Sequence, residues 1–331
     1  MEYYIVPVDN IEFENNNNSY LVTMQGNNLM DFCVSNSLPP SILNDNFQFW
    51  FGKFHLERIK QGNYFLVQDF HVIEPFKTDE ELQKIMNDKN AGLHFFYGSA
   101  LIFSLCLWII KDNSVSIPLG IYHNNSIGGG FPMTKNVMIS NSRGAYNTLV
   151  FSKEEFQKAN EWLDVLAEYF IEDTVVEREY SDYNNLNSDI NHNTNSFKRA
   201  LTYIEQARST SFLPAKIAHY ISVLETLFVV TDSNTYKTPE RTAVFLGGPK
   251  EERSNVFKIV KDSYKVRSSY VHGSDIAKKL NKKLDHISSD LDSVLRKVLI
   301  KFLTEFKELN YSGNDYTRVD QYFVDLVLGG S

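Results

Sequence analysis

The sequence predicts an α+β protein in two parts, a mixed α/β amino-terminal domain followed by an all-helical antiparallel bundle. Short runs of β-branched and aromatic residues, separated by turn-forming stretches, fill roughly the first 150 residues. From about residue 196 onwards, apolar residues recur instead at intervals of three and four, as in amphipathic helices. The chain has 331 residues, of which 43% are hydrophobic, so it can bury two cores.

Charge and cysteine content exclude several classes of protein. The formal net charge of -8 argues against a chain coated with positive charge for indiscriminate nucleic-acid binding, but it leaves room for a local basic groove. Cys33 and Cys106 are far apart and have no neighbour at metal-ligand spacing, so neither a disulfide scaffold nor a zinc site is expected. No metal and no cofactor are therefore predicted. The amino terminus does not resemble a secretory signal, so a cytoplasmic protein is expected.

The amino-terminal elements are predicted from local composition. Strands are expected at Tyr3–Val6, Tyr20–Met24, Phe47–Phe51 and Tyr64–Val67. A helix is expected at Asp79–Asn87. The many Tyr and Phe residues of this half are interpreted as strand core rather than as a stacking platform.

Leu93–Ile110 is almost wholly apolar and approaches the length of a membrane span. However, it contains His94 and Ser99, and Lys111-Asp112 follows it directly without a basic cluster that would set its orientation. These features favour a buried core helix that packs across the sheet, and no membrane partner is expected.

Two further features of the sequence receive structural interpretations. Gly128–Gly130 has no Gly-Lys-Ser/Thr after it, so a turn is favoured over a phosphate-binding loop. Five histidines lack metal-ligand spacing and are expected to be structural or exposed: His55, His71, His94, His123 and His192.

The domain boundaries follow from these patterns. Residues 1–150 form the mixed α/β domain, with a possible sensor or regulatory role, and 151–183 a connecting helix region that starts with the capping-box spacing Ser152-Lys-Glu-Glu155 and runs as a helix to about Ile171. Six of the twelve residues in 184–195 are Asn, which is typical of a solvated linker. Residues 196–310 form the helical domain, and 311–331 a carboxyl-terminal tail.

The helical domain is predicted to contain a bundle of four main helices joined by short connections. The expected helical segments are Phe197–Ile204, Pro214–Phe228, a shorter one from Pro239 to Gly247, Glu251–Tyr270 and Leu280–Leu309.

Arg267 and His272 stand at the carboxyl end of the fourth of these segments, just before Gly273. Arginine can hold a phosphate with two N–H donors, and histidine can take up or give a proton near neutral pH, so the pair suits RNA cleavage without a metal. Five residues along a helix separate two side chains by ~140°, so both reach one site only if the helix ends or tightens near His272. The alternative is a surface arginine and a helix-ending histidine.

This region resembles the HEPN superfamily, specifically its Apea-like branch. The resemblance covers about Asn195 to Leu309. It rests on Tyr264-Lys-Val-Arg-Ser-Ser-Tyr-Val-His-Gly273, which matches the family motif R-x-x-x-x-H with its trailing glycine. Upstream, the segment Lys216–Phe228 is similar to the family's helix that carries a glutamate before an aromatic or apolar pair.

The resemblance implies a domain that dimerises through its motif helices and brings two Arg–His pairs into one cleft. Many members look like metal-independent ribonucleases of toxin and antiphage systems, so RNA and a defence-system partner or antitoxin are the implied partners. Arg267 would neutralise the phosphate, and His272 would act as general base or acid to give 2′,3′-cyclic phosphate ends. Ser268 and Ser269 would contact phosphate or ribose, or only finish the helix. Glu225 would orient Arg267 or His272, or form a surface salt bridge.

Local charge agrees with an anionic substrate. The segment from Arg253 to Lys283 contains nine basic and two acidic residues, so its formal charge is +7 in an acidic protein. The lysines expected to bind RNA are Lys258, Lys261, Lys265, Lys278 and Lys279. The alternative is a solvated helix face whose lysines are paired elsewhere in the fold.

Two other classes of function compete with an endoribonuclease. Some HEPN domains resemble non-catalytic modules that bind nucleotides or RNA, or that assemble with a partner protein, and Arg267 would then bind phosphate without turnover. A transcription regulator is disfavoured because no helix-turn-helix pattern with a basic recognition helix is found.

Overall fold

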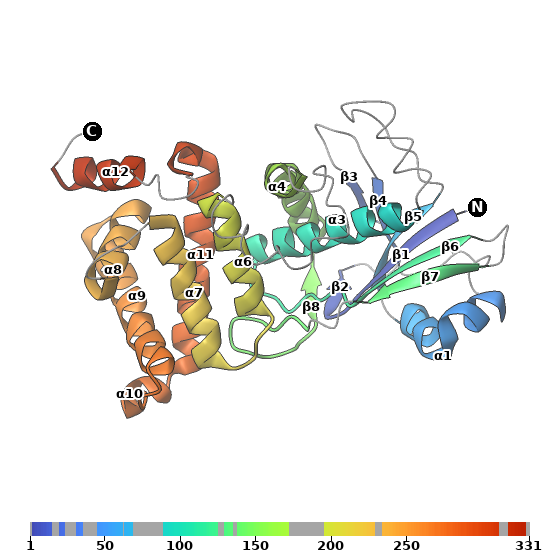
Figure 1. Cartoon of the computed structure of the whole chain (residues 1–331), viewed down its shortest axis with the longest axis horizontal. Helices are drawn as coiled ribbons and strands as arrows, with labels where there is room; N and C mark the ends of the chain where they lie inside the picture. The colour runs from blue at the N-terminus through green and yellow to red at the C-terminus, as the bar shows by residue number, and fades with distance from the viewer. Residues whose placement is uncertain are drawn as a thin grey trace, which may run out of the picture. The chain divides into compact units, whose positions relative to one another are not determined.

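The chain forms two compact units in the computed structural model (Figure 1), namely Met1–Ile139 with Tyr146–Tyr169 and Ser140–Ala145 with Phe170–Ser331. The residues that the structure describes are 2–14, 20–23, 31–35, 45–61, 63–68, 89–124, 129–134, 138–171, 195–228, 234–310 and 317–328. The predicted α+β class is confirmed, because a sheet and helices make up the first unit and helices the second.

The first unit contains a six-stranded sheet in which every neighbouring pair is antiparallel. Its strands, in spatial order, are β3 (Tyr20–Thr23), β4 (Asp31–Ser35), β5 (Asn63–Gln68), β1 (Glu2–Val8), β6 (Leu119–Asn124) and β7 (Gly129–Thr134). A separate parallel pair joins β2 (Ile11–Phe13) to β8 (Leu149–Phe151). The strands predicted at Tyr3–Val6 and Tyr64–Val67 are confirmed, as is Tyr20–Met24 up to Thr23, since Met24 lies outside the described residues.

Helices cover both faces of this sheet. Successive side chains of a strand point to opposite faces, so neighbouring residues of β1 contact different helices. Tyr3 and Ile5 of β1 share a buried cluster with residues of α1 (Asp45–Gln61). Tyr4, which lies between them, packs edge-on against Phe96 of α3 (Lys89–Ile110). The sheet is therefore the middle layer of the first unit.

The prediction of a strand at Phe47–Phe51 is wrong, because these residues open α1. Phe47 and Phe51 are buried and four residues apart, which is the spacing of one helix face, and their rings touch at 4.5 Å. Phe49 and Trp50 are exposed instead of packing as strand core. The dense run of aromatics resembled a strand locally, but burial follows the helical period.

Helix α3 confirms the prediction of a core helix at Leu93–Ile110, since it packs against β1 and β6. Its segment Gly92–Ile110 is long and apolar enough to cross a bilayer by length and composition, yet 67% of that stretch is buried within the fold. The Tyr97 hydroxyl donates to the Ile117 carbonyl at 2.6 Å, and burial raises the Tyr97 pKa to about 12. These contacts are those of a helix in a protein core.

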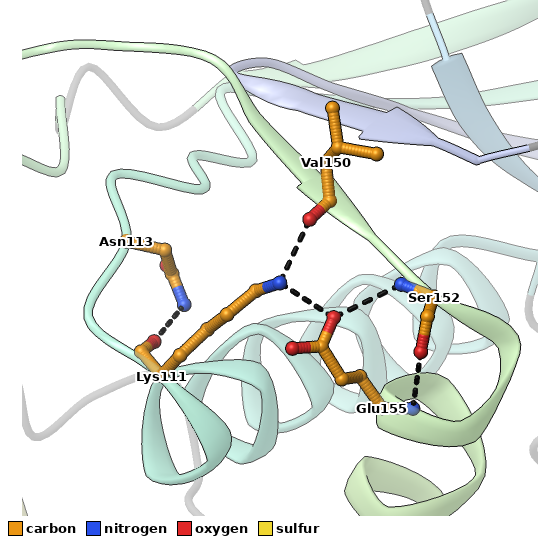
Figure 2. Close-up of polar contacts among 5 residues, drawn as sticks. All are labelled: Lys111, Asn113, Val150, Ser152 and Glu155. Atoms are coloured by element: carbon orange, nitrogen blue, oxygen red, sulfur yellow. Dashed lines mark hydrogen bonds and ion pairs between the residues drawn. The ribbon is translucent and has the colours of Figure 1, made fainter.

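The capping box predicted at the start of α4 (Lys153–Ile171) is confirmed (Figure 2). The Ser152 N–H donates to Glu155 Oε2 at 2.9 Å, and the Glu155 N–H donates to Ser152 Oγ at 3.2 Å. Lys111 lies just beyond α3 and donates to the same Glu155 carboxylate and to the Val150 carbonyl. One lysine thus connects the end of α3 to the beginning of α4.

The interpretation of Gly128–Gly130 as a turn is wrong for Gly129 and Gly130, which begin β7. A Cβ at Gly130 would lie 2.0 Å from the Tyr122 carbonyl oxygen, so the close approach of the two strands requires glycine there. Gly128, the predicted helix Asp79–Asn87 and nearly all of the linker 184–195 lie outside the described residues.

Every regular element that the structure describes in the second unit is a helix. Its helices are α6 (Ser196–Arg208), α7 (Leu213–Phe228), α8 (Asn234–Leu246), α9 (Lys250–Val271), α10 (Lys278–Asn281), α11 (Leu284–Glu305), the 3-10 turn η1 (Lys307–Leu309) and α12 (Thr317–Leu328). Helix α7 packs against α6, α8, α9 and α11, so it forms the centre of this unit. The helix predicted at Leu280–Leu309 is interrupted, because α10 and η1 flank α11.

The division of the chain differs from the predicted one at three places. Helix α4 belongs to the first unit as far as Tyr169 and does not form a connecting region. Ser140–Ala145, which precede α4 in the sequence, belong to the second unit. The tail 311–331 contains the helix α12, which packs against α8.

Candidate functional site

The carboxyl end of α9 is built around Gly273. Its φ of 65° lies in the left-handed region, which glycine adopts without strain. The Gly273 N–H donates to the Tyr270 carbonyl at 3.4 Å, and the Ser274 N–H donates to the Ser269 carbonyl at 2.9 Å. These two bonds form a Schellman motif, which satisfies the last carbonyls of the helix and places His272 at its C-cap.

Arg267 faces α7, the central helix of the unit. Its Nη2 lies 3.5 Å from Glu225 Oε2, and both side chains are largely shielded from solvent. The guanidinium also lies over the ring of Tyr264, one turn earlier on α9, with 5.5 Å between its Cζ and the ring centroid. The carboxylate and the ring together fix the direction of Arg267.

His272 is exposed, and among the described residues its side chain forms no hydrogen bond or ion pair. Its backbone N–H still donates to the Ser268 carbonyl four residues back, at 3.1 Å. The helical path is therefore kept up to His272, whose Cβ leaves the helix ~140° from that of Arg267. The end of the helix does not redirect the His272 side chain towards Arg267. Within the described chain, no contact therefore brings the two motif residues together.

The motif serines lie between these two residues and are half-buried. Ser268 contributes its carbonyl to the His272 N–H, and the Ser269 carbonyl accepts from both the N–H and, at 3.5 Å, the hydroxyl of Ser274. Their backbone groups therefore finish the helix, which is the second of the two roles expected for them.

Three lysines share the His272 face of α9. Lys258, Lys261 and Lys265 fall within ~40° of His272 around the helix axis, on the side away from Arg267. Lys258 and Lys265 are exposed, and Lys261 is half-exposed. Lys265 pairs with Asp262 at 2.7 Å, and Lys261 lies 5.5 Å from the ring of Phe257. The stripe points along α9 towards His272 and is only partly neutralised.

Lys278 and Lys279 are exposed on α10, shortly after the motif. The predicted basic surface therefore has two parts, the lysines of α9 and those of α10.

An apolar surface lies beside His272. Tyr270 is 43% and Val271 55% exposed, although both carry large hydrophobic side chains. Phe212, in the turn between α6 and α7, is 58% exposed, and its ring meets that of Tyr270 at 5.9 Å. Exposed apolar groups that cluster in this way mark contact surfaces more often than isolated ones do.

Local sequence patterns do not indicate the role of the segment Ser140–Ala145, which we call the strap. The Ser140 N–H donates to the Arg208 carbonyl at 2.8 Å, and Ser140 Oγ donates to the Thr210 carbonyl at 2.8 Å. At the other side of the strap, the Ser288 hydroxyl of α11 donates to the Ser142 carbonyl. The strap thus holds the α6–α7 turn and the beginning of α11.

Lys216 is a second residue whose environment local patterns do not predict. It is fully buried, and its ammonium donates to the Ala207 carbonyl at 2.7 Å and to the Ser140 carbonyl at 3.4 Å. Ala207 lies in the last turn of α6, where carbonyls lack helical partners and the helix dipole favours a cation. Lys216 therefore joins the end of α6, the strap and α7.

His219 follows one turn after Lys216 on α7. Burial, and then repulsion from Lys216, lower its pKa from the ordinary value of 6.5. Its ring stacks on that of Tyr203, with 6.5 Å between the centroids. His219 is half-buried beside Tyr203 and is not part of the motif surface.

Within the described ranges, no group of three or more His, Cys, Asp and Glu side chains is placed to hold a metal ion. Comparison of the chain with protein-family models, with curated proteins and with solved structures finds no match.

Proposed function

We propose that the second unit is a HEPN-type endoribonuclease that cuts RNA without a metal, acting in the cytoplasm as an effector of antiphage defence or as a toxin. The observation that supports this proposal best is the end of α9. There, an exposed His272 stands at the end of a lysine stripe, and Arg267 is held in a fixed direction by Glu225. The first unit would sense a trigger or restrain the effector.

His272 would remove the proton of a ribose 2′-hydroxyl, whose oxygen would attack the adjacent phosphate. The 5′-oxygen of the next nucleotide would leave with the proton that His272 has taken up, so the products would be a 2′,3′-cyclic phosphate and a 5′-hydroxyl. Arg267 would neutralise the charge that develops on the phosphate. Glu225 would be a positioning residue that keeps the guanidinium directed before RNA binds.

This chemistry requires two copies of the chain. Since Arg267 and His272 diverge by ~140° on one helix, a phosphate between them would be met by His272 of one copy and Arg267 of the other. The exposed Tyr270 and Val271 would supply apolar contact between the copies. We therefore propose a homodimer through the α9 ends.

The lysines would carry the RNA strand. Lys258, Lys261 and Lys265 would contact successive phosphates on the way to His272, and Lys278 and Lys279 would extend the basic surface. Replacing any one of these lysines by glutamine should lower the log–log slope of single-strand binding against salt concentration by about 0.7, because one phosphate is then no longer neutralised.

The experiment that tests the proposal compares purified wild type with His272→Ala on an RNA panel in chelator. Wild type should leave cyclic-phosphate ends, and His272→Ala should leave the RNA intact while keeping its helical circular dichroism. His286→Ala is the matched control, because His286 is also an exposed histidine of this unit. Equal cutting by wild type and His272→Ala, or no cutting by either, would contradict the nuclease proposal.

A mixing experiment tests the shared site separately. His272→Ala and Arg267→Ala chains should each be inactive, whereas a mixture should recover part of the activity, because a mixed dimer contains one site with both residues. A mixture that stays inactive although the two chains form a mixed dimer would contradict the assignment of Arg267 and His272 to different copies.

One observation favours the second candidate, a non-catalytic module that binds nucleotide or RNA or assembles with a partner or antitoxin. Glu225 already neutralises Arg267, and within the described chain nothing orients the His272 ring. A complex with a co-purifying partner that Arg267→Ala abolishes, with no RNA cut, would support this candidate.

A further inference from the structure

Three large aromatic side chains on α1 in the first unit are exposed. Phe49 is 83%, Trp50 52% and Phe54 73% accessible to solvent. We call these three residues the aromatic face. They contribute little to the core of the unit, which Phe47 and Phe51 of the same helix fill.

Two glycines set the geometry of the aromatic face. Gly52 has a φ of 80° and interrupts α1, so Trp50 and Phe54 lie on either side of a kink. Gly129 of β7 lies against Trp50, because a Cβ there would be 3.1 Å from the indole ring. A bare strand backbone thus supports one part of the indole, while half of the side chain stays open to solvent.

The rings of the aromatic face are nearly perpendicular to their neighbours and do not stack on them. Phe49 meets Trp50 edge-on, with 5.9 Å between the centroids and 90° between the planes. Phe54 meets His55 at 5.5 Å and 71°. In an edge-to-face pair the edge of one ring covers part of one face of the other, so a flat ligand would use the exposed faces that are turned away from the pair.

One exposed cation lies in the sequence between the residues of the aromatic face. Lys53, between Trp50 and Phe54, is exposed and forms no ion pair among the residues that the structure describes. Glu57 pairs with Lys60 at 3.5 Å, and Arg58 pairs with Asp9. Lys53, next to Phe54 in the sequence, is therefore an exposed cation that an anionic ligand of the aromatic face could reach.

We propose that the aromatic face binds a single-stranded RNA segment, with bases stacked on Trp50 and Phe54 and a backbone phosphate at Lys53. Aromatic rings interleaved with cations are what single-strand binding surfaces provide, because every base has a π-face and every linkage a negative charge. An apolar protein surface would instead bury the Lys53 ammonium without a partner. This site lies in the first unit and does not require that His272 cut RNA.

The test measures binding by the full-length chain rather than cleavage. The background carries His272→Ala together with glutamine at the five lysines of the basic surface, so that neither cutting nor that surface contributes: Lys258, Lys261, Lys265, Lys278 and Lys279. A labelled ten-nucleotide oligouridine is titrated by fluorescence anisotropy.

Trp50→Leu and Phe54→Leu should each weaken binding by about tenfold, while Trp50→Phe should stay within about threefold of the background. Tyr146→Leu, which alters an exposed aromatic of the same unit outside the face, should have no effect.

Leucine keeps the apolar surface and removes the π-face, so the comparison of Trp50→Leu with Trp50→Phe separates stacking from general hydrophobic contact. The oligouridine should also quench tryptophan fluorescence, and most of the quench should be lost in Trp50→Phe although binding remains. The other two tryptophans lie outside the aromatic face, since Trp108 is fully buried and Trp162 is a half-buried residue of α4.

Unchanged affinity in both leucine variants overturns the proposal. So does equal binding by uridine monophosphate and the decamer, which would indicate a nucleotide site, or a change of oligomeric state in Trp50→Leu without loss of RNA binding, which would indicate a protein contact. None of these outcomes depends on cleavage, so this site and the nuclease proposal can fail independently.

Discussion

Gly273 determines where α9 ends and hence where His272 stands. A Cβ at this position would meet nothing within 4 Å, so substitution there changes only the backbone preference. Because φ is 65°, an L side chain at position 273 has to adopt the left-handed region or break the Schellman bonds.

Gly273→Ala should therefore lower the free energy of unfolding by about 1 kcal/mol, measured by urea denaturation. Gly98→Ala is the control, because Gly98 lies inside α3 and its Cβ would also meet nothing within 4 Å. That substitution should instead be neutral or stabilising by about 0.5–1 kcal/mol. Equal effects of the two would mean that the left-handed conformation of Gly273 is not needed.

His219 gives the second unit a dependence on pH. Its pKa is lowered in the folded chain, first by burial and then by Lys216, and returns to the ordinary 6.5 on unfolding. Below about pH 6.5 the unfolded chain therefore binds a proton that the folded chain resists, so stability present at neutral pH is lost on acidification.

His219→Gln should reduce this loss. Urea denaturation at pH 7.5 and 5.5 should show a smaller decrease for His219→Gln than for wild type, whereas His286→Gln, at an exposed position, should match wild type. A residual decrease is expected in all three chains, because burial and Arg58 also lower the pKa of His55. An unchanged decrease in His219→Gln would remove His219 as its source.

At the scale of elements, sequence prediction succeeds where the signals are local. Helix α6 begins at its N-cap Asn195, α7 begins beside Pro214, and α9 lies between Pro249 and Gly273. The predicted start of α8 at Pro239 is wrong, because α8 begins at Asn234 and Pro239 lies inside it.

Phe47–Phe51 is misleading because five residues with four aromatics satisfy a strand pattern locally. The helix is favoured by the packing of Phe47 and Phe51 against the sheet, and the sheet residues that they contact are distant in the sequence.

The beginning of α4 gives a graded prediction. Ser152→Ala removes the acceptor of the Glu155 N–H and should lower the unfolding free energy by about 1 kcal/mol. Glu155→Gln keeps an acceptor for the Ser152 N–H but loses the ion pair with half-exposed Lys111, so about 0.5 kcal/mol is expected. Thermal unfolding followed by circular dichroism should rank them in this order, and Ser152→Thr should stay near wild type. A larger loss in Glu155→Gln would assign the main contribution to Lys111 rather than to the cap.

At the scale of the whole molecule, composition predicts two parts of the chain, but not which residues belong to each. The candidate site shows the same limit. Sequence patterns indicate both Arg267 and Glu225, and the two form an ion pair across 42 residues. Arg267 and His272 do not meet in the described chain, because the helical path continues to His272. The sequence sets the condition for their meeting, a helix that ends or tightens earlier, but not whether the helix does so. The strap escapes prediction because its bonds to Arg208 and Ser288 span 68 and 146 residues.

The strap predicts how the chain behaves when it is cut in the Asn-rich segment. A fragment 1–183 and a fragment 195–331, expressed together, should co-purify, because Ser140–Ala145 stay bound to the helical unit. Gly144→Val should weaken this association, since a Cβ at Gly144 would lie 2.4 Å from the Ser211 carbonyl oxygen. Gly98→Ala in fragment 1–183 is the control. Co-purification that Gly144→Val leaves unchanged would show that the strap does not hold the fragments together.

The strap also limits which segments of the gene can be exchanged by recombination. A gene fusion that joined the stretch encoding residues 196–310 to another amino-terminal domain would leave behind the strap, in which the Ser140 carbonyl accepts from Lys216 and the Ser142 carbonyl accepts from Ser288. The helical unit would then lose partners for two side chains that the fold has buried. Recombination should therefore keep the two units together, and descendants of this chain should exchange both or neither.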